Sequence, residues 1–197
     1  MTEIYISTDI EADGPIPGEY SMLSFGSVAL DSLGNSLGKF YKKIKPLQNA
    51  KQHPKTMEFW KKNQEAYKEA TANQEDPEKA MPEYLRWLRD IKVRYNKELV
   101  FVGYPATFDF MFIYWYLIKF TGESPFSFSA LDIKSYASAV LKKDFKQTNK
   151  KSMPKHWFPK EIKHNHTALD DALEQGLLFT NILKENLKNM LKVLILK

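Results

Sequence analysis

The sequence predicts an α/β protein with a mixed five-stranded sheet flanked by helices. Two observations support this prediction. Three strand patterns follow one another within the first 44 residues, and strand and helix patterns then alternate to the end of the chain. A strand meander followed by such alternation indicates a mixed sheet with helices on its faces. A length of 197 residues with 43% hydrophobic residues fits one compact domain spanning residues 1–197.

The first part of the chain contains three strand patterns. Residues 4–10 alternate between an apolar and a more polar face with the period of two that strands show, and Glu11 continues the second face. An apolar run over residues 22–30 leads into the turn-rich segment 31–35, and residues 40–44 resume a strand pattern. We therefore expect three successive antiparallel strands.

Two helices should follow these strands. The segment from Pro54 to Trp60 has the composition of a short helix that begins with proline. Asp76 and Pro77 form a good N-cap and first-turn pair for a second helix, which continues through Ile91.

The second half of the chain alternates between strand and helix patterns. Residues 99–102 form a compact apolar strand, and residues 109–120, ended by Gly122, have the length and apolar character of a buried helix. A short strand at residues 131–133 and a helix through Leu141 come next. Apolar residues near helical spacing between 169 and 182 then predict a long C-terminal helix.

Composition excludes several classes of chemistry. The chain has no cysteine, so it has no disulfide, no catalytic thiolate and no cysteine-ligated zinc or iron–sulfur site. A bound metal would have to sit on carboxylates and histidines. The sequence contains no long uncharged apolar run and no signal-peptide pattern, so we expect a cytoplasmic protein.

Positive charge is concentrated in one segment. The net charge is +5 and the pI is near 9.1, which is compatible with a polyanionic partner. The segment from Lys142 to Lys163 carries eight lysines and two acidic residues, whereas the rest of the chain is nearly neutral. This segment could bind phosphates or could be a solvated lysine-rich loop.

Two acidic residues occupy the end of the first strand. Asp9 and Glu11 are two positions apart, which places both carboxylates on one face, about 7 Å apart along the backbone. The turn over residues 12–15 should leave them at the exposed end of the sheet, where α/β active sites collect. They could share a cation there, or they could simply be solvent-facing acids at a strand end.

A third acid, Asp109, follows the strand at residues 99–102 after a short connection and opens the apolar helix. It could belong to the same site, or it could be an acid favoured at a helix start by the helix dipole.

The last cluster of polar residues precedes the C-terminal helix. Thr167 and Asp170 match a capping box, which gives Asp170 a structural role. Asp171 is not needed for capping and projects differently, near His166 in the preceding loop. We interpret His164 as a surface residue.

Together these residues resemble the DEDDh group of 3′–5′ exonucleases. This group belongs to the ribonuclease H-like superfamily and includes polymerase proofreading subunits, ribonuclease T and oligoribonuclease. The order of the motifs matches over nearly the whole chain. The motifs appear as Asp9-Ile10-Glu11 on the first strand, Phe108-Asp109 at a helix start, and His166 five residues before Asp171.

The resemblance implies a ribonuclease H-like fold and a metal-dependent hydrolase that releases nucleoside 5′-monophosphates from the 3′ end of RNA or single-stranded DNA. It implies two Mg²⁺ ions, with Mn²⁺ as a substitute. Asp9 would bridge both ions, Glu11 and Asp171 would complete the site of one, and Asp109 would help hold the other. His166 would act as the general base.

The resemblance also suggests where a strand would bind. Met22, Leu23 and Phe108 could pack against the last bases or belong to the core. The lysine-rich segment could hold backbone phosphates without reading sequence, through Lys150, Lys151 and Lys155. Within it, Trp157 and Phe158 could stack on bases or anchor the segment to the fold.

One part of the sequence departs from the family's pattern. Many family members carry His-Asn before the Phe-Asp motif, whereas this chain has Tyr104-Pro105, so a substrate contact made by that amide is missing. The resemblance also implies that a second copy of the chain is a partner in a homodimer, because the family's small stand-alone members commonly form dimers. The alternative function is a catalytically silent nucleic-acid-binding or interaction module on the same fold.

Overall fold

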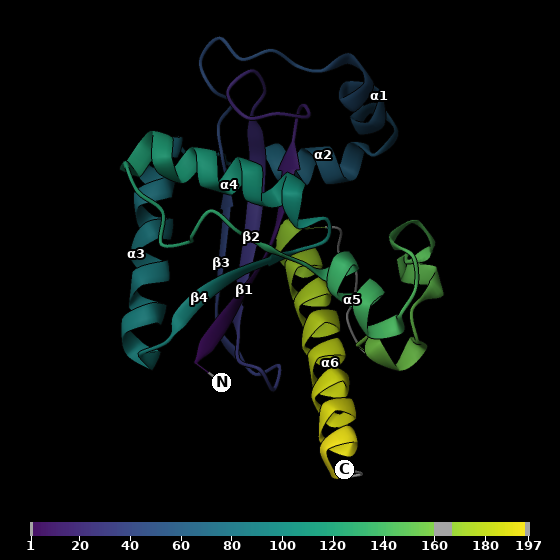
Figure 1. The fold of residues 1–197 in the computed structure, drawn as a ribbon. Helices are drawn as coiled ribbons and strands as arrows, with labels where there is room; N and C mark the ends of the chain where they lie inside the picture. Colours follow the sequence, from purple (N-terminus) through teal and green to yellow (C-terminus); the bar gives the residue numbers. More distant parts are fainter. Residues whose placement is uncertain (1, 160–166, 196–197) are drawn as a thin grey trace.

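A computed structural model describes residues 2–159 and 167–195 of the chain, with side chains up to residue 190. The backbone forms one five-stranded sheet with helices on both faces (Figure 1). Among the described residues, no helix combines the length and the apolar character that crossing a membrane requires.

The sheet is mixed and has the strand order β3-β2-β1-β4-β5. Its strands are β1 (Glu3–Ala12), β2 (Met22–Leu30), β3 (Ser36–Lys43), β4 (Glu98–Gly103) and β5 (Leu131–Asp132). The first three strands pair antiparallel, while β1 with β4 and β4 with β5 pair parallel. The predicted mixed five-stranded sheet is confirmed, with β1 at its centre.

Six α-helices accompany the sheet in the described part of the chain. They are α1 (Pro54–Lys62), α2 (Gln64–Thr71), α3 (Pro77–Tyr95), α4 (Ala106–Thr121), α5 (Ile133–Leu141) and α6 (Ala168–Ile195). The sequence analysis did not predict α2, because this short helix follows α1 with only Asn63 between them and no turn signal marks the boundary.

The alternating pattern of β1 creates two separate cores. Ile4, Ile6 and Ile10 pack with buried residues of α3 and α4, whereas Tyr5 packs with buried residues of α5 and α6. The two faces predicted for this strand are therefore both buried, each under its own pair of helices. Asp9 and Glu11 belong to the face that α6 covers, by the strand's period of two.

Two elements begin earlier than predicted, for identifiable reasons. In the turn before β3, the carboxylate of Asp31 accepts hydrogen bonds from the amides of Leu33 and Asn35, so the strand resumes at once at Ser36. Helix α4 begins at Ala106 because the amide of that residue donates to Asp132 Oδ2 at 3.0 Å, which satisfies a group that a helix start leaves unpaired.

Helix α6 lies unusually close to the sheet at two glycines. A Cβ atom at Gly26 of β2 would lie 2.4 Å from Leu169 Cα, and one at Gly176 would lie 2.7 Å from Ser7 Cβ. Only the absence of a side chain allows these approaches. Figure 1 shows the consequence: α6 runs along the sheet and begins near the carboxyl end of β1.

Residues 142–159 of the lysine-rich segment are described, and they reach the side of α6 (Figure 1). Its described part contains three short 3-10 helices, η1 (Phe145–Gln147), η2 (Lys150–Ser152) and η3 (Lys155–Trp157). Trp157 is fully buried, its ring nitrogen donates to Glu185 Oε2 at 2.5 Å, and its carbonyl oxygen accepts from Asn181 Nδ2 at 2.9 Å. Of the two roles considered for Trp157, the structure therefore supports the anchor.

Candidate active site

Three carboxylates converge where β1 meets the start of α6. Asp9 and Glu11 come from β1 and Asp171 from the first turn of α6, and one oxygen of each lies within 4.8 Å of the others. All three side chains are partly buried. Carboxylate oxygens at this separation form a suitable ligand set for a hard divalent cation.

Hydrogen bonds hold the start of α6 against β1. Ser7 Oγ donates to the carbonyl oxygen of Ala172 at 2.7 Å, and Gln175 Nε2 donates to the carbonyl oxygen of Thr8 at 2.7 Å. On the strand these bonds involve the two residues just before Asp9, and on the helix they involve residues within four positions after Asp171. The separation of the two carboxylates is thus set by buried contacts of their own elements.

The predicted helix cap is present in a modified form. Thr167 Oγ1 accepts from the amide of Asp170 at 3.2 Å and donates to Asp170 Oδ2 at 2.8 Å. Asp170 therefore binds the capping hydroxyl and has a structural role, as predicted, while Asp171 joins the carboxylate cluster.

Asp109 lies beside this cluster. It belongs to the first turn of α4, is 97% buried, and accepts a hydrogen bond from the amide of Ile10 at 3.2 Å through Oδ1. The bond ties α4 to β1 between Asp9 and Glu11. A Cβ atom at Gly103 would lie 3.1 Å from Asp109 Oδ2, so the glycine leaves room for this carboxylate.

Electrostatics disfavours four negative charges in this place. Burial, followed by the charges of Asp109, Glu11 and Asp171, raises the pKa of Asp9 well above its ordinary value. Burial and then the charge of Asp171 raise the pKa of Glu11 to about 7. Burial is also the main cause that raises the pKa of Asp109. A bound cation would favour the ionised forms.

The remaining predicted site residues differ in their surroundings. Met22 and Leu23 are fully buried in the hydrophobic core, which agrees with their core interpretation and leaves no surface for a base. Phe108 is partly buried, and its ring packs at 5.2 Å from that of Phe112. His166 lies outside the described residues.

The three lysines predicted to contact nucleic acid are not equivalent. All three are exposed, but their contacts differ. Lys150 reaches toward the carboxylates, with its Nζ atom 3.3 Å from Glu174 Oε1 and 5.5 Å from the ring centroid of Tyr104. The sequence analysis missed Glu174, although its position three residues after Asp171 would place it on the same face of α6.

A cavity of about 660 Å³ opens next to Glu11 and Asp171. Its other walls come from α1, α2 and their junction, and they consist of Phe59, Trp60, Lys62, Asn63, Gln64, Glu65, Ala66 and Glu69. Phe59 is 55% exposed, and the wall also contains two side-chain amides. The cavity therefore offers an aromatic ring and neutral polar groups beside the carboxylate cluster.

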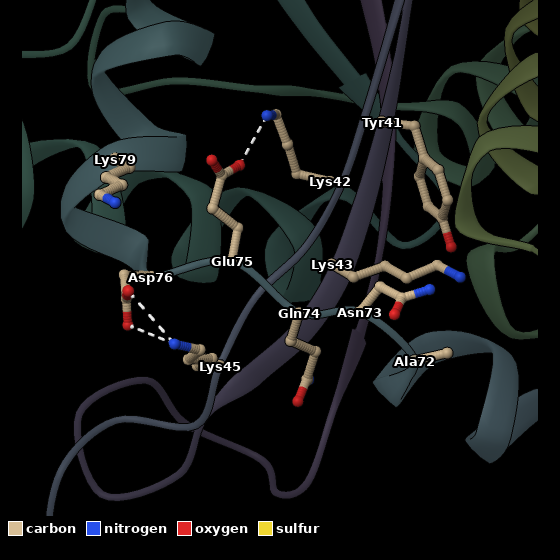
Figure 2. A pocket seen from close by; sticks show the side chains of 10 residues that line it. All are labelled: Tyr41, Lys42, Lys43, Lys45, Ala72, Asn73, Gln74, Glu75, Asp76 and Lys79. Atoms are coloured by element: carbon tan, nitrogen blue, oxygen red, sulfur yellow. Dashed lines mark hydrogen bonds and ion pairs between the residues drawn. The ribbon is translucent and has the colours of Figure 1, made fainter.

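A second cavity of about 530 Å³ lies between β3 and the loop that joins α2 to α3 (Figure 2). Three of the four lysines that line it have acidic partners: Lys42 lies 2.6 Å from Glu75, Lys43 lies 2.7 Å from Glu69, and Lys45 lies 3.1 Å from Asp76. Figure 2 shows the first and last of these pairs across the cavity. None of the residues that line this cavity belongs to the carboxylate cluster.

Known structures share this fold. The nuclease domain of 3′hExo, a DEDDh family member bound to rAMP, superposes with a TM-score of 0.60 at 14% identity and covers 93% of this chain and 92% of its own. S. pombe Pop2p, in its Mg²⁺- and Mn²⁺-bound form, superposes with a TM-score of 0.59 at 15% identity and covers 90% of this chain and 82% of its own. The predicted ribonuclease H-like fold is confirmed.

Sequence comparisons identify the family. The 3′–5′ DNA exonuclease Cap18 of Escherichia coli is 34% identical over 189 residues, which cover 96% of each chain. The family model described as 3′–5′ exoribonuclease Rv2179c-like domain matches residues 5–183. The predicted relationship to 3′–5′ exonucleases is therefore confirmed, and this chain belongs to the 3′–5′ exoribonuclease Rv2179c-like domain family.

Proposed function

We propose that this protein is a metal-dependent exonuclease that hydrolyses the phosphodiester bond at the 3′ end of RNA or single-stranded DNA and releases nucleoside 5′-monophosphates. The observation that carries the proposal is the convergence of the Asp9, Glu11 and Asp171 carboxylates, with Asp109 beside them. A member of an exonuclease family that had lost catalysis would have no need to keep these mutually repelling groups together.

The donor set fits divalent cations. Four carboxylates come together in a chain that has no thiolate, and this donor set suits Mg²⁺ or Mn²⁺. The raised pKa values of Asp9, Glu11 and Asp109 are what such a cation would offset. Asp9, Glu11, Asp109 and Asp171 would hold two such ions. When bound, the ions would lower the pKa of the attacking water and offset the negative charge of the phosphate.

The protein's own residues would position the substrate and move one proton. We assign the general base to His166, which stands five residues before Asp171 in the sequence. Histidine suits this role because its ordinary pKa lies near neutral pH. It would accept the proton of the attacking water. Other residues of the protein would hold the nucleic-acid strand so that its terminal phosphodiester faces the carboxylate cluster.

The surroundings of the cluster suit the end of a strand. The neighbouring cavity can accept a terminal nucleoside, with Phe59 available for stacking. Phe108 stays a candidate for a contact with a base. Met22 and Leu23 are buried, so they would contribute to the site through core packing only. Lys151 and Lys155 are exposed and would hold upstream phosphates.

A matched assay tests this proposal. End-labelled RNA and DNA strands of one sequence are incubated with Mg²⁺ or with chelator, using the wild-type protein and the Asp171→Asn variant. We expect mononucleotides from the wild type with Mg²⁺ only. Cap18 is named a DNA exonuclease and the family an exoribonuclease, so the relative rates on the two strands decide the substrate. Binding without hydrolysis of either strand would support the silent module instead.

A further inference from the structure

Lys150 occupies a position that Lys151 and Lys155 do not share. Its backbone is held by a capping box in which Ser152 N donates to Asn149 Oδ1 at 3.1 Å and Asn149 N donates to Ser152 Oγ at 3.0 Å. Two bonds within four residues restrict the direction in which the Lys150 side chain can leave the backbone.

Two further contacts aim this side chain at the carboxylate cluster. The ammonium group lies 5.5 Å from the ring centroid of Tyr104, which follows β4 directly, and 3.3 Å from Glu174 Oε1. Glu174 is nearly buried and stands one helical turn after Asp171 on α6. The ammonium group is therefore placed at the rim of the cluster, and the Lys150 side chain is still 45% exposed.

The positive charge of Lys150 acts on Asp9 of the carboxylate cluster. Burial and the neighbouring acids raise the pKa of Asp9, and the positive charge of Lys150 opposes that rise. Stability alone gives a weak reason for this arrangement, because an ion pair with a half-exposed lysine contributes little to the free energy of unfolding. An exposed ammonium group beside a metal-ligand set is, in contrast, well placed for an anionic substrate.

We propose that Lys150 is a catalytic residue that contacts the phosphate undergoing hydrolysis and stabilises the negative charge of its non-bridging oxygens in the transition state. Tyr104 and Glu174 position it. This inference rests on the proposed exonuclease function and separates Lys150 from Lys151 and Lys155, to which we assign contacts with phosphates that are not cleaved. In this role Lys150 acts through its positive charge and transfers no proton.

The experiment compares Lys150→Met with Lys92→Met by steady-state kinetics on a single-stranded oligonucleotide in Mg²⁺. Methionine keeps an unbranched stem against Tyr104 but removes the charge. Lys92 is a matched control, because it is 41% exposed and forms an ion pair with Glu98 at 2.6 Å. Glu98 begins β4, whereas Tyr104 follows its last residue, so this pair lies at the far end of the strand from Lys150. Thermal unfolding of both variants separates a folding defect from a loss of chemistry.

We expect Lys150→Met to lower kcat by roughly tenfold or more, as removal of a transition-state donor does, with KM changed less than about twofold. The same loss should appear on a nitrophenyl ester of a nucleoside 5′-monophosphate, which has a single phosphodiester, and Lys150→Arg should restore part of kcat. Lys92→Met should behave as the wild type.

Three results would overturn the inference: a raised KM with unchanged kcat, a loss confined to the oligonucleotide, or equal behaviour of Lys150→Met and Lys92→Met. The first two would make Lys150 a contact for an upstream phosphate, and the third would make it a surface ion pair. If the wild-type protein hydrolysed neither the oligonucleotide nor the nitrophenyl ester, the proposed exonuclease function itself would be contradicted. Failure of the Lys150 inference and failure of the proposed function are therefore distinguishable.

Discussion

At the residue scale, the account depends on acids that sit together at an electrostatic cost. Asp9 and Asp171 come from different elements, and their carboxylate oxygens lie within 4.8 Å. Replacing either with asparagine should lower kcat by more than roughly a hundredfold, because even supporting groups around a metal change activity by 10–100-fold. The fold should stay intact, since one source of repulsion is removed. Nuclease assays and thermal unfolding of each variant check both parts.

Asp170 provides the control for this prediction, because it neighbours Asp171 but binds the capping hydroxyl of Thr167. Asp170→Asn should cost about 1 kcal/mol of stability or less, as other changes at helix caps do, and should leave kcat nearly unchanged. An activity loss as large as that of Asp171→Asn would reverse the roles assigned to the two residues.

Glu11 makes the metal-free protein sensitive to pH. Its pKa is raised from 4.5 to about 7, so the folded protein binds more protons than the unfolded chain between these values. The stabilisation is fully present below about pH 4.5 and is lost as the pH rises through about 7. In chelator, Glu11→Gln should therefore raise the Tm at about pH 8, by about 2–4 °C for each kcal/mol gained, and leave it unchanged at about pH 4.5.

The carboxylate of Glu65 is the matched control for this effect, because it is 92% exposed and forms an ion pair with Lys68 at 3.3 Å, away from the carboxylate cluster. Glu65→Gln should leave the Tm unchanged at both pH values. Equal Tm differences for the two variants would show that general surface charge, and not the carboxylate cluster, controls the pH response.

The sequence indicated the acids of the site but not the surroundings of each lysine. The spacing of Asp9 and Glu11 and the cap before Asp171 are local features, so their placement on β1 and α6 could be predicted. The contact between Lys150 and Glu174 depends on how η2 packs against α6, and no local pattern encodes that packing. His166 lies outside the described residues, and its role stays a prediction.

At the element scale, the close packing of the start of α6 on β2 determines where Asp171 lies. A Cβ atom at Gly26 would lie 2.4 Å from backbone atoms of Leu169, two residues before Asp171. Gly26→Ala should therefore displace the start of α6, cost about 1–3 kcal/mol as overpacked cores do, and weaken stabilisation by Mg²⁺. Urea unfolding with and without Mg²⁺ measures both effects.

Gly38 of β3 is the matched control for this prediction. A Cβ atom there would lie 3.2 Å from Ile91 Cδ1, the end of a flexible side chain. Gly38→Ala should cost less stability and should keep the full response to Mg²⁺. Equal costs for the two variants, or a normal Mg²⁺ response in Gly26→Ala, would contradict the role given to the close approach.

Element types were easier to predict than element boundaries. The period-two pattern of β1 and the helical pattern of α6 are strong because each continues over many residues. The start of α4 at Ala106 depends on a bond to Asp132, which is 26 residues away in the sequence. Long-range bonds of this kind leave no signal in a local window.

At the scale of the whole molecule, fold class and family could be predicted because the motifs appear in the right order on the right elements. Asp9 on β1, Asp109 on α4 and Asp171 on α6 are far apart in the sequence, and the sheet order β3-β2-β1-β4-β5 brings them together. The homodimer stays a prediction, since the sequence pattern contains no signal for its surface.

The measurement that tests the central claim most directly is the fate of three substrates in Mg²⁺: a single strand labelled at its 5′ end, the same strand with a blocked 3′ end, and a single-stranded circle. Our account predicts stepwise shortening of the first from its 3′ end, resistance of the second and no cleavage of the third, with all hydrolysis lost in chelator. Cleavage of the circle, or equal activity in chelator, would contradict it.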